Sequence, residues 1–342
     1  MREELMKRAI VSIIFALGVA FASPAFAQIE CKPGEVVIKF SHVVPPRGHP
    51  KGDFARMLAE RVNSEMNGRA CMQVFPFSQL YDDEKVMEAL ILGDVQLAAP
   101  SLSKLEVYTN KYRLFDLPFL FEDMDAVQRF TASDQGQELL DVMSDFGVVG
   151  LGYLFDGLKH FSADKPLLVP SDGAGLKFRV QNSDVAVAMI EAMGASAQKL
   201  AFKEVYGALQ LGVVDGQENS WSNIFTSRFY EVQNGITETN HQLLAYVVFA
   251  PKEWLESLEP DLRDQFLTIF RETLVKANAQ AAQTSEENRQ RIVDAGYTVR
   301  ELTPEQRQQW VDVMRPVWGD FEDQIGKDLI AAAVAANTPE DN

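Results

Sequence analysis

Three basic residues are placed where a ligand could meet them. Lys51 lies in the loop after the first predicted strand, Lys159 follows a later strand, and Arg179 ends the strand 175–180. In open α/β sheets, ligands bind beyond the carboxyl ends of the strands. A guanidinium can hold a carboxylate through two parallel hydrogen bonds, each worth roughly 1.5–3 kcal/mol. The spacing therefore predicts a cationic site for a carboxylate, with Arg179 as its main contact.

Neutral polar and aromatic side chains are expected to complete this site, because they too follow predicted strands. The expected contacts are His42, Ser101, Asn219, Trp221 and Asn223. Each type also has an ordinary structural role. A histidine can support its loop, an asparagine can occupy a turn, a tryptophan can fill a core, and lysines and arginines can pair with surface acids.

Catalytic and metal-binding patterns are weak. Residues 101–104 read S-x-x-K, but no K-T-G follows, and the sequence contains no G-x-S-x-G, G-x-G-x-x-G or P-loop. The four histidines lack H-E-x-x-H spacing, and two cysteines do not make a zinc site. Only His42 and His49, on one loop, could suggest a metal. We therefore expect neither an enzyme nor a cofactor or metal site.

The first 27 residues read as a signal peptide. Arg2, Lys7 and Arg8 precede an apolar run, and Ala25-Phe26-Ala27 has the small-x-small pattern of a cleavage site. The apolar run is short for a retained membrane anchor, which is the alternative. We expect cleavage after Ala27 and export of the rest of the chain.

The net charge of −17 opposes nucleic acid as a partner, since binding to phosphates requires a basic face. It also means that a site for an anion has to be built from a few specific cations. Cys31 and Cys71 lie just before or at the start of two predicted strands. If those strands are parallel neighbours, the cysteines share one end of the sheet and can form a disulfide after export; two free thiols are the alternative.

The N-terminal half alternates strands, at 36–40, 71–75 and 95–99, with helices at 52–66 and 82–92. This order predicts a parallel sheet covered by helices. A second series follows: strands at 148–154, 175–180, 213–214 and 245–249, helices at 185–193 and 202–211, and a turn at Asp215-Gly216. Residues 260–295 predict one long helix or two abutting ones, and a further helix starts at Thr303.

Several segments together resemble one family, the DctP-type solute receptors of TRAP transporters. They are FSHVV (40–44), LYDDEKVMEAL (80–90), LGDVQLAAPS (92–101), FDLPFLF (115–121), GLKFRVQ (175–181) and VVDGQENSWSN (213–223). The resemblance extends over nearly the whole exported chain, and the last two segments are the most specific.

The resemblance implies an α/β fold of two lobes, like a type II periplasmic binding protein, with crossover segments and a long C-terminal bracing helix. We expect lobe I to comprise residues 28–153 plus 244–283, and lobe II residues 154–243 plus 284–342. It further implies that Arg179 holds the substrate carboxylate, that Asn219 faces the same cleft, and that the loaded periplasmic receptor delivers its ligand to TRAP permease subunits in the membrane.

One stretch departs from the family pattern. C4-dicarboxylate receptors often have Trp and Asn where this chain has Leu154 and Asp156, whereas Lys159 is retained. An added carboxylate beside the cleft should weaken or reposition a second anionic end. The ligand is thus expected to be a C4-dicarboxylate or a related organic acid; a sugar acid, 2-oxo acid or aromatic acid, and a role as ligand-sensing partner of a membrane kinase, are the alternatives.

Overall fold

Two β-sheets organise the chain in this computed structural model, which describes residues 29–339. The predicted signal peptide lies outside the described residues. The first sheet has the order β2-β1-β3-β10-β4, formed by β1 (Val36–Ser41), β2 (Ala70–Phe75), β3 (Leu97–Ala98), β4 (Val148–Leu158) and β10 (Leu243–Pro251). The second has the order β11-β9-β5-β8-β6-β7, formed by β5 (His160–Ala163), β6 (Lys177–Val180), β7 (Ser196–Lys199), β8 (Gly216–Asn219), β9 (Ile236–Glu238) and β11 (Val299–Glu301).

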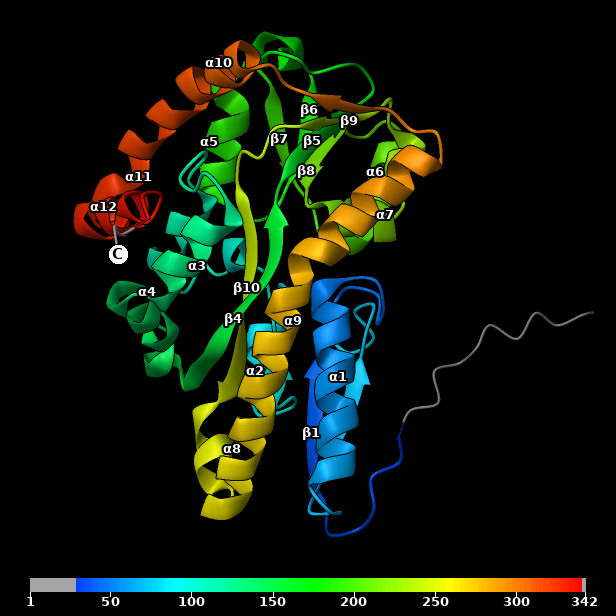
Figure 1. Ribbon diagram of the computed structural model, residues 1–342, viewed down its shortest axis with the longest axis vertical. Coiled ribbons are helices and arrows are strands. Elements are labelled where there is room, and N and C mark those ends of the chain that lie inside the picture. Colours follow the sequence, from blue (N-terminus) through cyan, green and yellow to red (C-terminus); the bar gives the residue numbers. More distant parts are fainter. Residues whose placement is uncertain (1–28, 340–342) are drawn as a thin grey trace, which may run out of the picture. The chain divides into compact units, whose positions relative to one another are not determined.

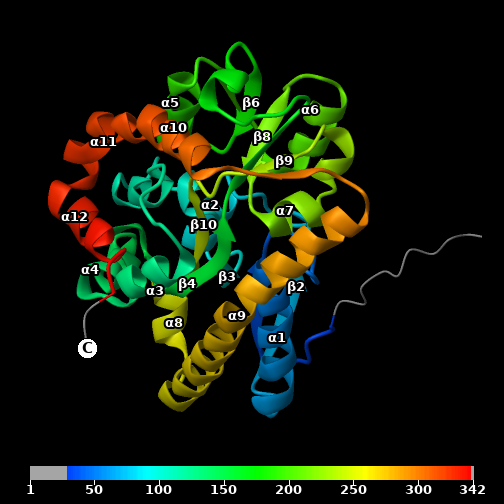
Figure 2. The same cartoon turned by 45° about the horizontal axis from the view of Figure 1, so that its top comes forward.

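Helices cover both sheets (Figures 1 and 2). They are α1 (Pro50–Glu65), α2 (Val86–Ile91), α3 (Met124–Ala132), α4 (Asp134–Glu138), α5 (Asp184–Ala192), α6 (Val205–Gln210), α7 (Trp221–Thr226), α8 (Lys252–Ser257), α9 (Pro260–Asp294), α10 (Pro304–Met314), α11 (Trp318–Ile325) and α12 (Lys327–Ala335). We call each sheet with the elements packed on it the first-sheet half and the second-sheet half. Within residues 29–339, no helix combines the length and the apolar character needed to cross a membrane.

The first three strands confirm the predicted parallel arrangement, since β1 pairs in parallel with both β2 and β3. The other two strands of this sheet, β10 and β4, are antiparallel to their neighbours, so the sheet is mixed. The register of β1 and β2 places Cys31 and Cys71 at one end of the sheet, and the predicted disulfide joins them.

The two halves share several segments. Strand β4 leads directly into β5, and β9 leads back into β10, so two of the connections between the sheets are extended chain. The third runs from β10 through α8 and α9 to β11. The predicted long helix is a single helix, α9, that packs on α1 and β4 of one half and on α7 of the other (Figures 1 and 2). The lobe boundaries stay a prediction. Phe321 and Ile330 of the C-terminal helices, which the prediction assigns to lobe II, pack in the apolar core of the first-sheet half.

One strand prediction was wrong. The expected strand at 213–214 and turn at Asp215-Gly216 are replaced by strand β8, which begins at Gly216 and carries Glu218 and Asn219 itself. The side chain of Val213 is half exposed, so its apolar character did not indicate a buried strand. The polar residues of β8 are buried instead because Gln217 and Asn219 form side-chain hydrogen bonds and Glu218 forms an ion pair with Lys159.

The first turn of α1 is packed directly against the preceding loop. A Cβ atom at Gly52 would overlap the carbonyl of Pro45, whereas one at Gly207 in α6 would meet nothing within 4 Å. Glycine at position 52 therefore permits a close backbone contact beside Lys51.

We expect Gly52→Ala to destabilise the protein by roughly 1–3 kcal/mol, because the backbone of a packed loop has to move. The matched change Gly207→Ala should be neutral or stabilise by about 0.4–1 kcal/mol, since alanine restricts the unfolded chain. Urea denaturation of both variants measures the difference. Equal free energies of unfolding for Gly52→Ala and Gly207→Ala would show that the loop can move away from position 52 without cost.

Candidate functional site

Arg179 is the last-but-one residue of β6, and its side chain is only 1% exposed. Its Nε and Nη2 atoms donate to the carbonyl oxygen of Leu200, at 3.1 and 2.8 Å. Its Nη1 atom has no hydrogen-bond partner within residues 29–339. Burial lowers the pKa of Arg179, while the negative charge of Glu218 and more distant acids opposes that shift. The guanidinium is thus fixed along one side and has donors left on its end.

Lys51 is buried in the first turn of α1. Its Nζ donates to the carbonyl oxygen of Ala99 at 3.0 Å and lies 3.9 Å from the centre of the Tyr246 ring. In the part of the chain that the structure describes, no carboxylate forms an ion pair with it. Burial lowers the pKa of Lys51, opposed by the charges of Asp83 and Asp156. Asp83 also raises the pKa of Arg179, so the two cations share an acidic neighbour.

Lys159 differs from Lys51 in its surroundings, because oxygen atoms of three side chains surround its ammonium group. Nζ lies 2.7 Å from Gln242 Oε1, 2.9 Å from Gln181 Oε1 and 3.0 Å from Glu218 Oε2. An ammonium group has three N–H donors. Two of the three oxygens accept hydrogen bonds from Lys159, and the third belongs to an ion pair in which Glu218 balances its charge.

His42 and Ser101, at the ends of strands of the first sheet, are buried without hydrogen bonds to their side chains. Both ring nitrogens of His42 and the hydroxyl of Ser101 have no partner within residues 29–339. Burial, together with the charge of Lys51, holds the pKa of His42 well below 6.5, so its ring is neutral at pH 7. Buried polar atoms of this kind are available to a ligand.

The predicted residues of β8 and α7 form a chain of amides. Asn219 Nδ2 donates to Gln217 Oε1 at 3.1 Å, and Asn223 Nδ2 donates to Asn219 Oδ1 at 2.6 Å. One N–H of Asn219 remains available. The buried ring of Trp221 packs against His160, with the ring centres 4.3 Å apart, so it is placed as a packing residue.

His49, which the sequence suggested only as a possible metal ligand, connects these groups across the two halves. His49 caps α1, and its Nδ1 accepts the backbone N–H of Lys51. Its proton is therefore on Nε2, which lies 3.0 Å from Asn223 Oδ1 and 3.1 Å from Asp156 Oδ2. The hydroxyl of Tyr246 donates to the same Asp156 oxygen at 2.8 Å. Only the position of His49 before a proline at a helix start could have signalled a capping role.

Asp156 is expected from the sequence to place an added carboxylate beside the cleft, and the structure shows its contacts. Its buried carboxylate is compensated by His49 and Tyr246, and although burial alone would raise the pKa of Asp156, these partners lower it below its usual value. Asp156 therefore belongs to the frame that positions Lys51 and Asn223. The contacts of His49 and Tyr246 are both to Oδ2, while Oδ1 has no hydrogen-bond partner within residues 29–339.

Taken together, a buried Arg, a buried Lys and several neutral polar atoms, drawn from both sheets, are suited to hold a small organic anion. A protein of two α/β halves with such a site has the architecture of a solute-binding protein.

Comparison with known proteins identifies the family. Residues 40–324 match the model of DctP, described as bacterial extracellular solute-binding protein, family 7, so this chain belongs to that family of TRAP-transporter receptors. It is 58% identical over 311 residues to the C4-dicarboxylate-binding periplasmic protein DctP of Vibrio cholerae, covering 91% of this chain and 94% of that protein.

Two solved structures show the same fold. A TRAP periplasmic solute-binding protein from Shewanella oneidensis with bound succinate has a TM-score of 0.87 and 50% identity, covering 89% of this chain and all of that one. One from Pseudomonas aeruginosa with bound L-malate has a TM-score of 0.81 and 37% identity, covering 83% and 99%. The predicted fold class and family are thereby confirmed.

Asp116 is a second buried carboxylate, and its hydrogen bonds to two serines can be tested. Its buried carboxylate accepts hydrogen bonds from Ser103 at 2.5 Å and Ser183 at 2.7 Å. Burial, which outweighs the opposing charge of Lys159 and both hydroxyl bonds, raises the pKa of Asp116 to about 6.

Because the pKa is raised in the folded state, the stabilising contribution of Asp116 is present below about pH 4 and is lost as the pH rises through 6. Relative to Asp116→Asn, the wild type should therefore gain on the order of 2–3 kcal/mol between pH 7 and pH 4. Urea denaturation at both pH values measures this, with the exposed Asp320→Asn as control. A constant difference between wild type and Asp116→Asn would contradict the assignment.

Proposed function

We propose that this protein is the periplasmic receptor of a TRAP transporter and binds a C4-dicarboxylate such as succinate or L-malate, which it delivers to the membrane permease. The observation that carries the proposal is Arg179, a buried guanidinium that is held by a neutral carbonyl and keeps free donors. The name of the Vibrio cholerae relative and the ligands bound in the two solved structures point to the same class of substrate.

Arg179 would bind the first carboxylate end-on. The carbonyl of Leu200 takes Nε–H and one N–H of Nη2, which leaves Nη1 and the outer N–H of Nη2. These two nitrogens form a fork that matches the two oxygens of a carboxylate. The hydrogen bonds to Leu200 keep the fork in one orientation before a ligand arrives.

Lys51 would bind the second carboxylate. One of its N–H groups is used by Ala99 and one face of the ammonium meets Tyr246, so at least one N–H remains. It is buried and lacks an ion-paired acid among the described residues, unlike Lys159, which has Glu218. The two cations come from different halves, so a ligand with two charged ends would connect them.

Neutral groups would complete the binding. His42, Ser101 and Asn219 have unused polar atoms, which can exchange hydrogen bonds with carboxylate oxygens or with a hydroxyl such as that of malate. A micromolar affinity requires about 8 kcal/mol in net terms, which one bidentate Arg, one Lys and a few neutral hydrogen bonds can supply.

Titration calorimetry with succinate tests the main contact. We expect Arg179→Lys to weaken binding roughly a hundredfold, because lysine retains the charge but loses the two-pronged geometry. Lys177→Met is the matched control, since this exposed residue lies on the same strand. A separate NMR measurement tests for turnover. After incubation with the protein, no product of succinate should appear in the spectrum, as expected for a receptor.

Lys51→Met tests the second end of the ligand. We expect it to weaken succinate by roughly tenfold to a hundredfold, while butyrate, of the same length with a single carboxylate, should bind the variant and the wild type equally weakly. If Arg179→Lys binds succinate as the wild type does, the proposed site is wrong. If Lys51→Met affects both ligands alike, the assignment of the second carboxylate is wrong.

A further inference from the structure

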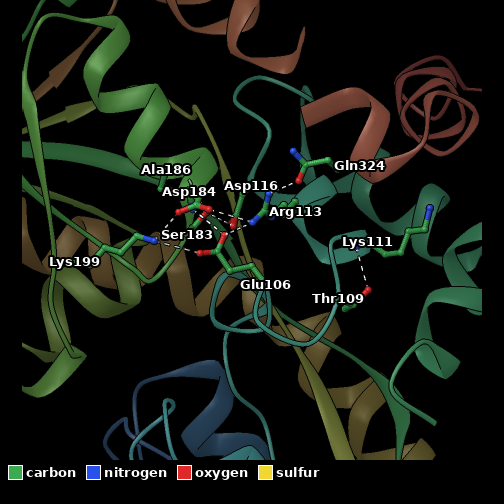
Figure 3. A network of polar contacts seen from close by, with 10 residues as sticks. All are labelled: Glu106, Thr109, Lys111, Arg113, Asp116, Ser183, Asp184, Ala186, Lys199 and Gln324. Carbon is green, nitrogen blue, oxygen red and sulfur yellow. Dashed lines mark hydrogen bonds and ion pairs between the residues drawn. The ribbon is translucent and has the colours of Figure 1, made fainter. Parts of the chain in front are cut away.

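Four charged side chains form a closed network beside the start of α5 (Figure 3). Glu106 lies 3.2 Å from Lys199 and 3.5 Å from Arg113. Asp184 lies 2.8 Å from Lys199 and 3.1 Å from Arg113. Each acid thus contacts both bases, and the four charges sum to zero.

Glu106 is the centre of this network. Its side chain is 8% exposed and that of Arg113 is 11% exposed, compared with 35% for Lys199 and 54% for Asp184. Besides both bases, Glu106 accepts the backbone N–H of Asp184 at 2.8 Å, in the first turn of α5. Shielded ion pairs with such bonds are stronger than exposed ones. The hydrogen bond from Lys199 lowers the pKa of Asp184, in line with a stable ionised pair.

The network joins the two halves of the molecule. Glu106 and Arg113 belong to a segment whose neighbours Leu105 and Tyr112 are buried in the core of the first-sheet half. Asp184 begins α5, and Lys199 ends β7 of the second sheet. Adjacent contacts reinforce the junction, because Ser183 donates to Asp116 and Val185 is buried in that same core.

The two segments that the network holds are those on either side of Arg179. Lys199 is followed by Leu200, whose carbonyl oxygen fixes Nε and Nη2 of Arg179. The other segment runs from Arg179 along the end of β6 to Ser183 and Asp184. The backbone of Lys199 pairs with Val180, and the N–H of Leu200 donates to the carbonyl of Val180 at 3.3 Å. The strand pairing and the network at the side chain of Lys199 therefore act together on the Leu200 carbonyl that orients the guanidinium fork.

We propose that Glu106 is a positioning residue for the anion site. From the first-sheet half it holds Lys199 and the start of α5, and through Leu200 it sets the orientation of Arg179. The carboxylate fork is then complete only when the two halves are together, which links ligand binding to their closure. This inference rests on the proposed function, because it assigns the role of Glu106 to the same site.

The first experiment does not require a ligand. The Nε–H signal of Arg179 in nitrogen-15 NMR spectra, assigned by its loss in Arg179→Lys, reports on the bond to Leu200. We expect Glu106→Gln to shift this signal and to accelerate its exchange with water, without succinate or with saturating succinate. Glu231→Gln, which removes an acid paired with Arg228 elsewhere in the second-sheet half, should leave it unchanged.

The second experiment measures succinate binding in a double-mutant cycle of Glu106→Gln and Lys199→Gln. Each variant should weaken binding roughly tenfold, and the double variant should be little weaker than either, because both changes break one contact chain. Lys199 is partly exposed, so its variant keeps the test decisive if Glu106→Gln fails to fold.

The outcomes separate the two proposals. A wild type that does not bind succinate would refute the proposed ligand, while the Arg179 signal would still decide the role of Glu106. If the variants lower stability but leave both that signal and the succinate affinity at wild-type values, the network is an interface between the halves and the inference is wrong.

Discussion

A buried guanidinium held by a carbonyl oxygen is the contact around which the site is arranged. Had a carboxylate taken the place of Leu200, the charge of Arg179 would be neutralised within the protein and a ligand anion would have to displace it. A neutral acceptor fixes the orientation of the side chain while leaving its charge to be compensated by a ligand. The acids around it, Glu218 foremost, reduce the energetic cost of burying that charge without occupying its free end.

The two buried lysines show that burial alone does not define a binding residue. Lys159 has three oxygen neighbours, including the carboxylate of Glu218, so its charge is already balanced within the second-sheet half. Lys51 has a carbonyl and an aromatic face, which hold it in place without neutralising it. Both residues are lysines, so the sequence alone does not distinguish them. In the structure, they differ in whether a carboxylate of the protein already balances the charge of the ammonium group.

Local patterns in the sequence predicted the local features of the fold. Strands β1 and β2, the disulfide and the placement of Arg179 at a strand end follow from residue patterns and spacing. Helix α9 follows from a long run of helix formers, which left open whether one helix or two would form. Polar strand β8 was missed because its burial depends on partners such as Ser162, far away in the chain. The same holds for His49, which contacts Asn223 across 174 positions, and for the network around Glu106. Such contacts are created by the fold and leave no local periodicity.

Helix α9 has a mechanical consequence. It contacts both halves, and none of its 35 residues after the initial Pro260 is glycine or proline, the residues at which helices usually kink. Displacement of one half relative to the other must therefore be absorbed as gentle curvature along the helix or at the extended connections from β4 and into β10. A bent elastic rod returns energy when it straightens. The brace can thus supply a restoring force on the two halves that is independent of the chemistry of the ligand.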